Sequence, residues 1–108
     1  MNPALRPIRL ALLAACLAAS GAQAEPTPSQ TLHLRALAAT CANCHGTDGR
    51  AVDGAGNVKL QGMDKAYLIE QMTAFRDGKR QATVMHQLAK GYSPAQVEQI
   101  AAYFAAQR

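Results

Sequence analysis

The sequence predicts a small all-α fold in which an N-terminal and a C-terminal helix pack together. Three observations favour this class. Apolar residues recur at helical spacing in three separate stretches. The connection between the first two stretches is rich in glycine and shows no strand-like alternation. The length of 108 residues leaves room for one small domain and excludes a multidomain enzyme.

Residues 1–24 have the pattern of an export signal. Arg6 and Arg9 precede an apolar run that is too short to span a bilayer. Ala22 and Ala24 are small residues at the two positions that a signal peptidase recognises. We therefore expect a periplasmic protein without a membrane span. An amphipathic or disordered N-terminus is the alternative.

Cys16 raises a second alternative, because residues 13–16 (LAAC) are similar to a lipoprotein cleavage site. Cleavage there would leave a lipid anchor on Cys16. We favour the ordinary signal, because few apolar residues precede Cys16 and the chain stays apolar after it. The mature protein would then consist of a short linker, residues 25–30, and one domain, residues 31–108.

The domain is predicted to begin with a helix over residues 31–40 that continues into the next motif. Leu34, Leu37, Ala38 and Cys41 are spaced as one helix face.

Residues 46–62 contain too many glycines for regular structure and are predicted to form a wrapping loop. A second helix follows Asp64, a residue that caps helix starts well. It is predicted to end at Gly78, because glycine readily adopts the backbone conformation of a helix C-terminus. Its apolar face contains Leu68, Met72 and Phe75.

The final helix has the clearest start. Ser93 and Gln96 have the spacing of a capping box, and Pro94 occupies the first helical position. The apolar stripe of this helix consists of Val97, Ile100, Ala101 and Phe104.

Cys41, Cys44 and His45 form the pattern CxxCH, which is typical of covalent c-type haem attachment. Two thiols three positions apart can each bond to one haem vinyl group, and the adjacent imidazole can then bind the iron. Export agrees with this assignment, since c-type haem is attached outside the cytoplasmic membrane. We therefore predict one covalently attached haem c.

Three other uses of neighbouring cysteines fit the chain less well. A disulfide between Cys41 and Cys44 would close too small a loop to stabilise the fold much. A thioredoxin-like redox pair needs a βαβ context. A zinc site needs four ligands, and beyond the motif only His33 and His86 are present, singly placed.

The second axial ligand of the iron is predicted to be Met85. Met63 follows His45 so closely that little chain remains to wrap around the haem. Met72 lies on the apolar face of a helix, where packing is the usual role. Met85 comes after a glycine break and a polar stretch, so a loop or short helix can present it. The remaining candidates are His86, the rival next to Met85, and His33.

A haem would also supply interior that the side chains lack. The chain has no Trp, three Tyr and two Phe, and a domain of this size is marginally stable without a further interior group. The residues predicted to pack around the macrocycle are Leu34, Leu37, Leu60, Leu68, Val97, Ile100 and Phe104.

On these residues the chain resembles the class I cytochromes c, in particular small monohaem domains of the bacterial c553 type and the cytochrome subunit of flavocytochrome c sulfide dehydrogenase. The resemblance covers the mature chain and rests on residues 41–46 (CANCHG), 75–80 (FRDGKR), 82–85 (ATVM), 89–93 (AKGYS) and 102–104 (AYF). It implies N- and C-terminal helices packed around one haem. Cys41 and Cys44 would form the thioethers, His45 would be the proximal ligand and Met85 the distal one.

One departure from the family pattern concerns His45. Family members often have a proline near the carbonyl that accepts a hydrogen bond from the proximal histidine, but none occurs here between Pro28 and Pro94. We expect residues 56–60 to supply the carbonyl without that rigid support.

The positive charge does not indicate a nucleic-acid partner. The formal net charge of +4 falls to +2 when Arg6 and Arg9 leave with the signal, because every acidic residue lies in the mature chain. A basic cluster remains, defined here as Arg76, Lys79, Arg80 and Lys90. It is either a solvated face or a docking surface for an acidic redox partner.

An iron with both axial positions filled supports electron transfer rather than substrate turnover. We therefore predict a periplasmic electron carrier, and not an enzyme, that passes single electrons between a dehydrogenase or membrane complex and a terminal acceptor. The main alternative is a tightly bound haem subunit of a flavin-containing oxidoreductase such as a sulfide dehydrogenase. A sensing or enzymatic haem with a labile distal ligand is a third possibility.

Overall fold

The computed structural model describes residues 24–54 and 56–108. This described part contains five α-helices, two short 3₁₀ helices and no strand, which confirms the predicted all-α class. Most of the predicted export signal, including Cys16, lies outside the described residues. Within them, every helix is too short or too polar to cross a bilayer.

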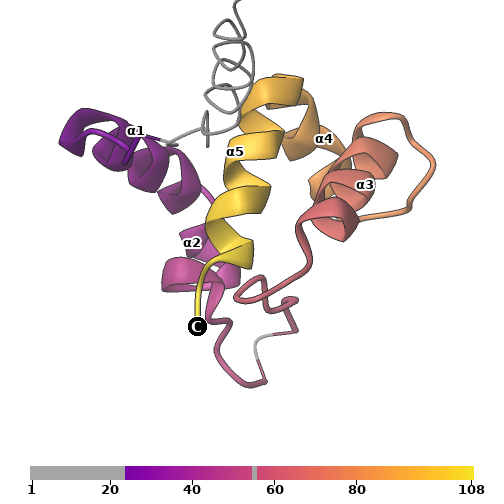
Figure 1. Cartoon of the computed structure of the whole chain (residues 1–108). Coiled ribbons are helices and arrows are strands. Elements are labelled where there is room, and N and C mark those ends of the chain that lie inside the picture. Colours follow the sequence, from indigo (N-terminus) through magenta and orange to yellow (C-terminus); the bar gives the residue numbers. More distant parts are fainter. Residues whose placement is uncertain (1–23, 55) are drawn as a thin grey trace, which may run out of the picture.

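The helices follow one another as α1 (Pro28–Ala39), α2 (Ala42–His45), η1 (Thr47–Gly49), α3 (Lys65–Arg76), α4 (Met85–Leu88), η2 (Ala89–Gly91) and α5 (Pro94–Ala105). In Figure 1, α5 lies in the centre, with α1 and α2 on one side and α3 and α4 on the other. Both α1 and α3 pack against α5. The C-terminal helix therefore joins the two halves of the molecule.

The start of α1 differs from the prediction. Thr27 caps it, since the Thr27 N–H donates to Gln30 Oε1 (2.8 Å) and Thr27 Oγ1 accepts from the Gln30 N–H (3.2 Å). Pro28 then occupies the first helical position, which its fixed φ suits. The predicted linker, residues 25–30, is therefore wrong for its second half, because this proline starts a helix rather than interrupting one.

The end of α1 also differs from the prediction. The helix stops at Ala39, and Thr40 and Cys41 form a turn before α2. The turn is tight, because the Thr40 N–H donates to Leu37 O (3.3 Å) and the Cys41 N–H to Ala38 O (3.1 Å). The cysteine motif therefore has its own short helix.

The predicted ends of α3 are confirmed. Asp64 Oδ1 accepts from the Tyr67 N–H (2.8 Å) at the start of the helix. At its end Gly78 has a φ of 71°, and the next N–H, that of Lys79, donates to Ala74 O (2.8 Å). With the Gly78 N–H bonded to Phe75 O (3.2 Å), this is a Schellman motif, which reverses the chain direction.

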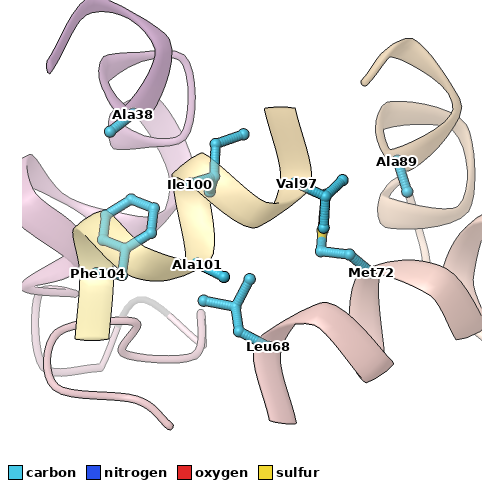
Figure 2. Packing of buried hydrophobic residues seen from close by; sticks show 8 residues of the cluster. All are labelled: Ala38, Leu68, Met72, Ala89, Val97, Ile100, Ala101 and Phe104. Atoms are coloured by element: carbon cyan, nitrogen blue, oxygen red, sulfur yellow. The ribbon is translucent and has the colours of Figure 1, made fainter. Parts of the chain in front are cut away.

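The predicted capping box of α5 is confirmed by two hydrogen bonds. Ser93 Oγ accepts from the Gln96 N–H (3.2 Å), and Gln96 Oε1 accepts from the Ser93 N–H (2.9 Å). The whole predicted stripe of α5 is buried, and Phe104 and Ile100 are the largest fully buried side chains of the described part. Figure 2 shows the core, which consists of Ala38, Leu68, Met72, Ala89, Val97, Ile100, Ala101 and Phe104.

Candidate haem-binding site

A cavity of about 400 Å³ adjoins the CxxCH motif, a volume within the usual range for small-molecule sites. Cys41, Cys44 and His45 line it from α2 and the turn before it, and Met85 lines it from the start of α4. All four predicted site residues thus border one space. A larger, more open depression beside α1 and Tyr103 contains none of them.

The His45 ring is oriented by the glycine-rich loop. Its Nδ1 lies 2.6 Å from the Val58 carbonyl oxygen. Because a carbonyl can only accept, Nδ1 carries the hydrogen, and the Nε2 lone pair is left to bind a metal. The expectation that residues 56–60 supply this carbonyl is confirmed, even though no proline supports the loop.

The two motif cysteines carry free thiols. Cys44 is exposed and Cys41 is half-buried. Burial raises the pKa of the Cys41 thiol, while a hydrogen bond with Thr40 acts in the opposite direction. Among the described residues no group of three or more His, Cys, Asp or Glu side chains could hold a metal ion, so the zinc alternative has no support there.

Position in the fold separates the candidates for the distal ligand. Met85 is half-buried and borders the cavity. Met72 also borders it, but its side chain is only 8% exposed and extends toward Val97 in Figure 2, so it is engaged in helix packing. Met63 packs against the core without lining the cavity. The two histidine candidates, His33 and His86, do not line the cavity either.

The apolar wall of the cavity differs in part from the prediction. Leu60, Leu68 and Ile100 line it. The other residues predicted to surround the macrocycle lie elsewhere, namely Leu34, Leu37, Val97 and Phe104. The reason is that the apolar face of a helix can pack against other helices and against loops as well as against the cavity. The Phe104 ring, for example, is packed closely against Gly49.

Two cavity residues that local sequence patterns did not identify are Thr40 and Tyr92. Thr40 Oγ1 lies 2.8 Å from Leu37 O and 2.6 Å from the Tyr92 hydroxyl. The single Thr40 hydroxyl hydrogen goes to the carbonyl, so Tyr92 donates to Thr40. This bond joins the residue before Cys41 to the segment that leads into α5. The only sequence indication was the family resemblance of residues 89–93.

Asp48, which lies in η1 just after the motif, is bonded to Tyr103 of α5. The Tyr103 hydroxyl donates to Asp48 Oδ1 (2.5 Å), and Arg50 Nη1 lies 3.7 Å from Asp48 Oδ2. The hydrogen bond to this carboxylate, together with burial, raises the pKa of Tyr103. Asp48 has a φ of 55°, unusual for a residue other than glycine. The bond to Tyr103 therefore holds a strained turn in place.

The four residues of the basic cluster differ in their side-chain contacts. Arg76 Nε lies 3.5 Å from Asp77 Oδ1, and the Arg80 guanidinium lies over the Phe75 ring. Lys79 and Lys90 are exposed, and neither forms an ion pair with a described residue. Arg80 is also exposed, but its guanidinium contacts Phe75 and Gln71.

The helical fold and the motif-lined cavity are those of a cytochrome c. The family model for cytochrome c matches residues 35–107, and the chain belongs to this family. It is similar to a thiosulfate dehydrogenase electron acceptor of Thiomonas intermedia, with 37% identity over 98 residues, which cover 91% of this chain and 44% of that protein. It is also similar to the cytochrome subunit of sulfide dehydrogenase of Chlorobaculum tepidum, with 34% identity over 89 residues, covering 81% of this chain and 79% of the subunit.

A solved structure of cytochrome c4 from Acidithiobacillus ferrooxidans has the same fold. It superposes with a TM-score of 0.57 at 38% identity, over 61% of this chain and 38% of that one. The chain spans less than half the length of several relatives that it matches.

Members of this family carry covalently bound haem c, and the described site fits that cofactor. Two free thiols stand at the attachment spacing, an imidazole nitrogen is left free by the bond to Val58, and a thioether sulfur is present on the same cavity.

Proposed function

We propose that this chain is a one-electron carrier whose haem c is attached through Cys41 and Cys44, with His45 and Met85 as the axial ligands. The observation that carries the proposal is that the motif and Met85 border one cavity from different elements. Imidazole and thioether together fill both axial positions and leave none for a substrate. The chemistry that the bound haem supplies is then exchange of single electrons between Fe(III) and Fe(II).

The surrounding residues set the conditions for this exchange. The Val58 carbonyl fixes the His45 ring and makes Nε2 a stronger donor. Leu60, Leu68 and Ile100 make part of the wall apolar, and an apolar wall limits the access of water to the site. Thioether ligation favours the reduced iron. Together these residues support a comparatively high reduction potential.

Absorption spectra of the wild type and of Met85→Ala test the ligand assignment. The ferric wild type should show the long-wavelength sulfur-to-iron band, and the variant should lose it and bind CO when reduced. Met63→Ala is the matched control and should keep the band, because Met63 does not line the cavity. A band that persists in Met85→Ala would assign the sulfur to another residue, foremost Met72.

The exposed lysines support docking to an acidic redox partner. Neither lysine lines the cavity itself, but both lie close in sequence to residues that do. Lys79 is next to Arg80, and Lys90 lies between Leu88 and Tyr92. Opposite charge on a partner would raise the association rate at low ionic strength. We expect Lys79→Gln/Lys90→Gln to slow electron transfer at low salt and to differ little from wild type at high salt. A wild-type rate that is indifferent to salt would contradict this docking mode.

A second candidate function is that of a bound subunit in a dehydrogenase complex. The observation in its favour is that the chain covers 79% of the Chlorobaculum protein, which is named as a cytochrome subunit of sulfide dehydrogenase. Native mass measurement after purification from the source organism distinguishes the two functions. A monomer supports the carrier, and a stable heterodimer with a flavoprotein supports the subunit.

We also propose that residues 1–24 direct the chain to the periplasm and are removed there. Mass spectrometry of the mature protein should then place Glu25 at the N-terminus. An acylated N-terminal Cys16 would instead show a lipid-anchored protein.

A further inference from the structure

The Schellman motif at the end of α3 returns the chain to the cavity. After the Gly78 turn, the N–H groups of Lys79 and Arg80 both donate to Ala74 O, at 2.8 and 3.2 Å. The backbone of Arg80 is therefore fixed beside the last turns of α3, and its side chain becomes part of the cavity wall.

The guanidinium of Arg80 is held by two side chains of α3. Its Cζ lies 4.7 Å from the centroid of the Phe75 ring, and its Nη1 donates to Gln71 Oε1. Stacking on an aromatic face and a hydrogen bond to an amide restrict the orientation of the planar group. A guanidinium has five N–H donors, and described side chains accept from one of them. The group is thus oriented, with donors left for another acceptor.

The charges around the cavity leave this cation without an anion. Arg80 is the only lysine or arginine among the described residues that line it, and no aspartate or glutamate lines it. No ion pair of the described part includes Arg80. The other titratable residues on the wall are Cys41, Cys44, His45 and Tyr92. A carboxylate entering the cavity would find one fixed cation there.

We infer that Arg80 binds a propionate carboxylate of the haem, rather than a docking partner. The inference rests on the proposed function, because it requires haem in this cavity. Guanidinium and carboxylate match in charge and geometry, and an arginine can donate two parallel N–H bonds to one carboxylate. Gln71 and Phe75 act as positioning residues for Arg80. Arg80 thereby leaves the basic docking cluster and becomes a cofactor-binding residue.

The test is a pH titration of the haem propionates by NMR in the haem-loaded protein. A nearby arginine lowers a carboxyl pKa, so Arg80→Gln should raise one propionate pKa by about 1 or more. Arg80→Lys keeps the charge and should raise it less. Lys79→Gln is the matched control, because it removes the neighbouring cation outside the cavity wall, and it should leave both propionate pKa values unchanged.

An unchanged propionate pKa in Arg80→Gln, or an equal rise in Lys79→Gln, overturns the assignment. If Arg80→Gln slows electron transfer only at low salt and the propionates titrate as in the wild type, Arg80 is a docking residue. Optical spectra of the same samples keep the two proposals separate. A wild type without a haem c spectrum contradicts the proposed function, whereas a normal spectrum with unaltered propionates contradicts only the role of Arg80.

Discussion

The attachment side of the molecule, residues 41–62, and its distal side, residues 79–92, are held in place differently. On the attachment side, Gly49 O accepts from the N–H groups of Leu60 (2.9 Å) and Gln61 (3.1 Å). On the distal side, the described main-chain hydrogen bonds outside helices include none from residues 81–83, which instead line or adjoin the cavity. The attachment loop is thus fixed by directional bonds. On the distal side Arg80 and Tyr92 are bonded as well, and we expect only the segment between them, residues 81–83, to depend on contact with the cavity's occupant.

The largest effect is expected from removing both attachment thiols. Cys41→Ala/Cys44→Ala should yield a haem-free chain without a cooperative unfolding transition, because a group that binds only the folded state no longer stabilises it. Far-UV circular dichroism during urea titration measures this. Amide exchange should show the distal side losing protection most completely. Cooperative unfolding near the wild-type midpoint would mean that the distal side does not need its occupant.

A large effect that originates on the attachment side is expected from Gly49→Ala. Gly49 has a φ of 73°, and a Cβ there would lie 2.7 Å from Gln61 N and 2.9 Å from Phe104 Cδ1. Backbone strain and overpacking together should lower the free energy of unfolding by about 2–5 kcal/mol. Denaturant titration of the haem-loaded protein measures the change.

Gly54→Ala is the matched control for that substitution. Gly54 has a φ of 80°, but apart from its chain neighbours no described residue lies within 4 Å of its would-be Cβ. Only the backbone term remains, about 1–2 kcal/mol. Equal losses in the two variants would show that the packing of Gly49 against α5 does not hold the attachment side.

An intermediate effect is expected from Tyr103→Phe, which removes the bond to Asp48. A hydrogen bond to a charged group contributes about 1.5–3 kcal/mol. Because Asp48 raises the Tyr103 pKa in the folded state, this contribution is complete below the unfolded tyrosine pKa of about 10. It is lost as pH rises through the higher folded value.

The measurement is the difference in unfolding free energy between wild type and Tyr103→Phe, followed from neutral to alkaline pH. The difference should be constant below about pH 9 and shrink above about pH 10. A difference that grows with alkalinity would have the wrong sign for the Asp48 interaction.

The smallest effect is expected from Lys65→Ala. Lys65 Nζ lies 2.7 Å from Glu98 Oε2 and joins α3 to α5, but both side chains are about half exposed (48% and 54%). Exposed ion pairs contribute less than about 1 kcal/mol. A loss above about 2 kcal/mol in urea titration would mean that surface charge, and not the cavity's occupant, holds α3 and the distal side.

The sequence predicted well those features that depend on neighbouring residues. The caps at Asp64 and Ser93 and the turn at Gly78 are bonds between residues close in the chain, and each has a known residue pattern. The carbonyl of Val58 was predicted through the family resemblance, which implies such an acceptor in the stretch after the motif. Pro28 was misjudged, because a proline before a helix and a proline at its first position look alike in a pattern.

Pairs of distant residues could not be predicted in this way. The bond from Tyr92 to Thr40 and that from Tyr103 to Asp48 depend on how α1, α3 and α5 are packed. Spacing within one segment contains no information on such pairs. For the same reason Arg80 was grouped with its charged neighbours, and its place on the cavity wall became visible only in the fold.

The two matching capping boxes, TPSQ at residues 27–30 and SPAQ at residues 93–96, have a consequence for the order of folding. Each helix start is encoded locally, so α1 and α5 can begin to form within about a microsecond of each other, the timescale of helix formation in short segments. Their mutual packing must wait until the long chain between them closes. The rate of folding would then reflect loop closure, and not helix initiation.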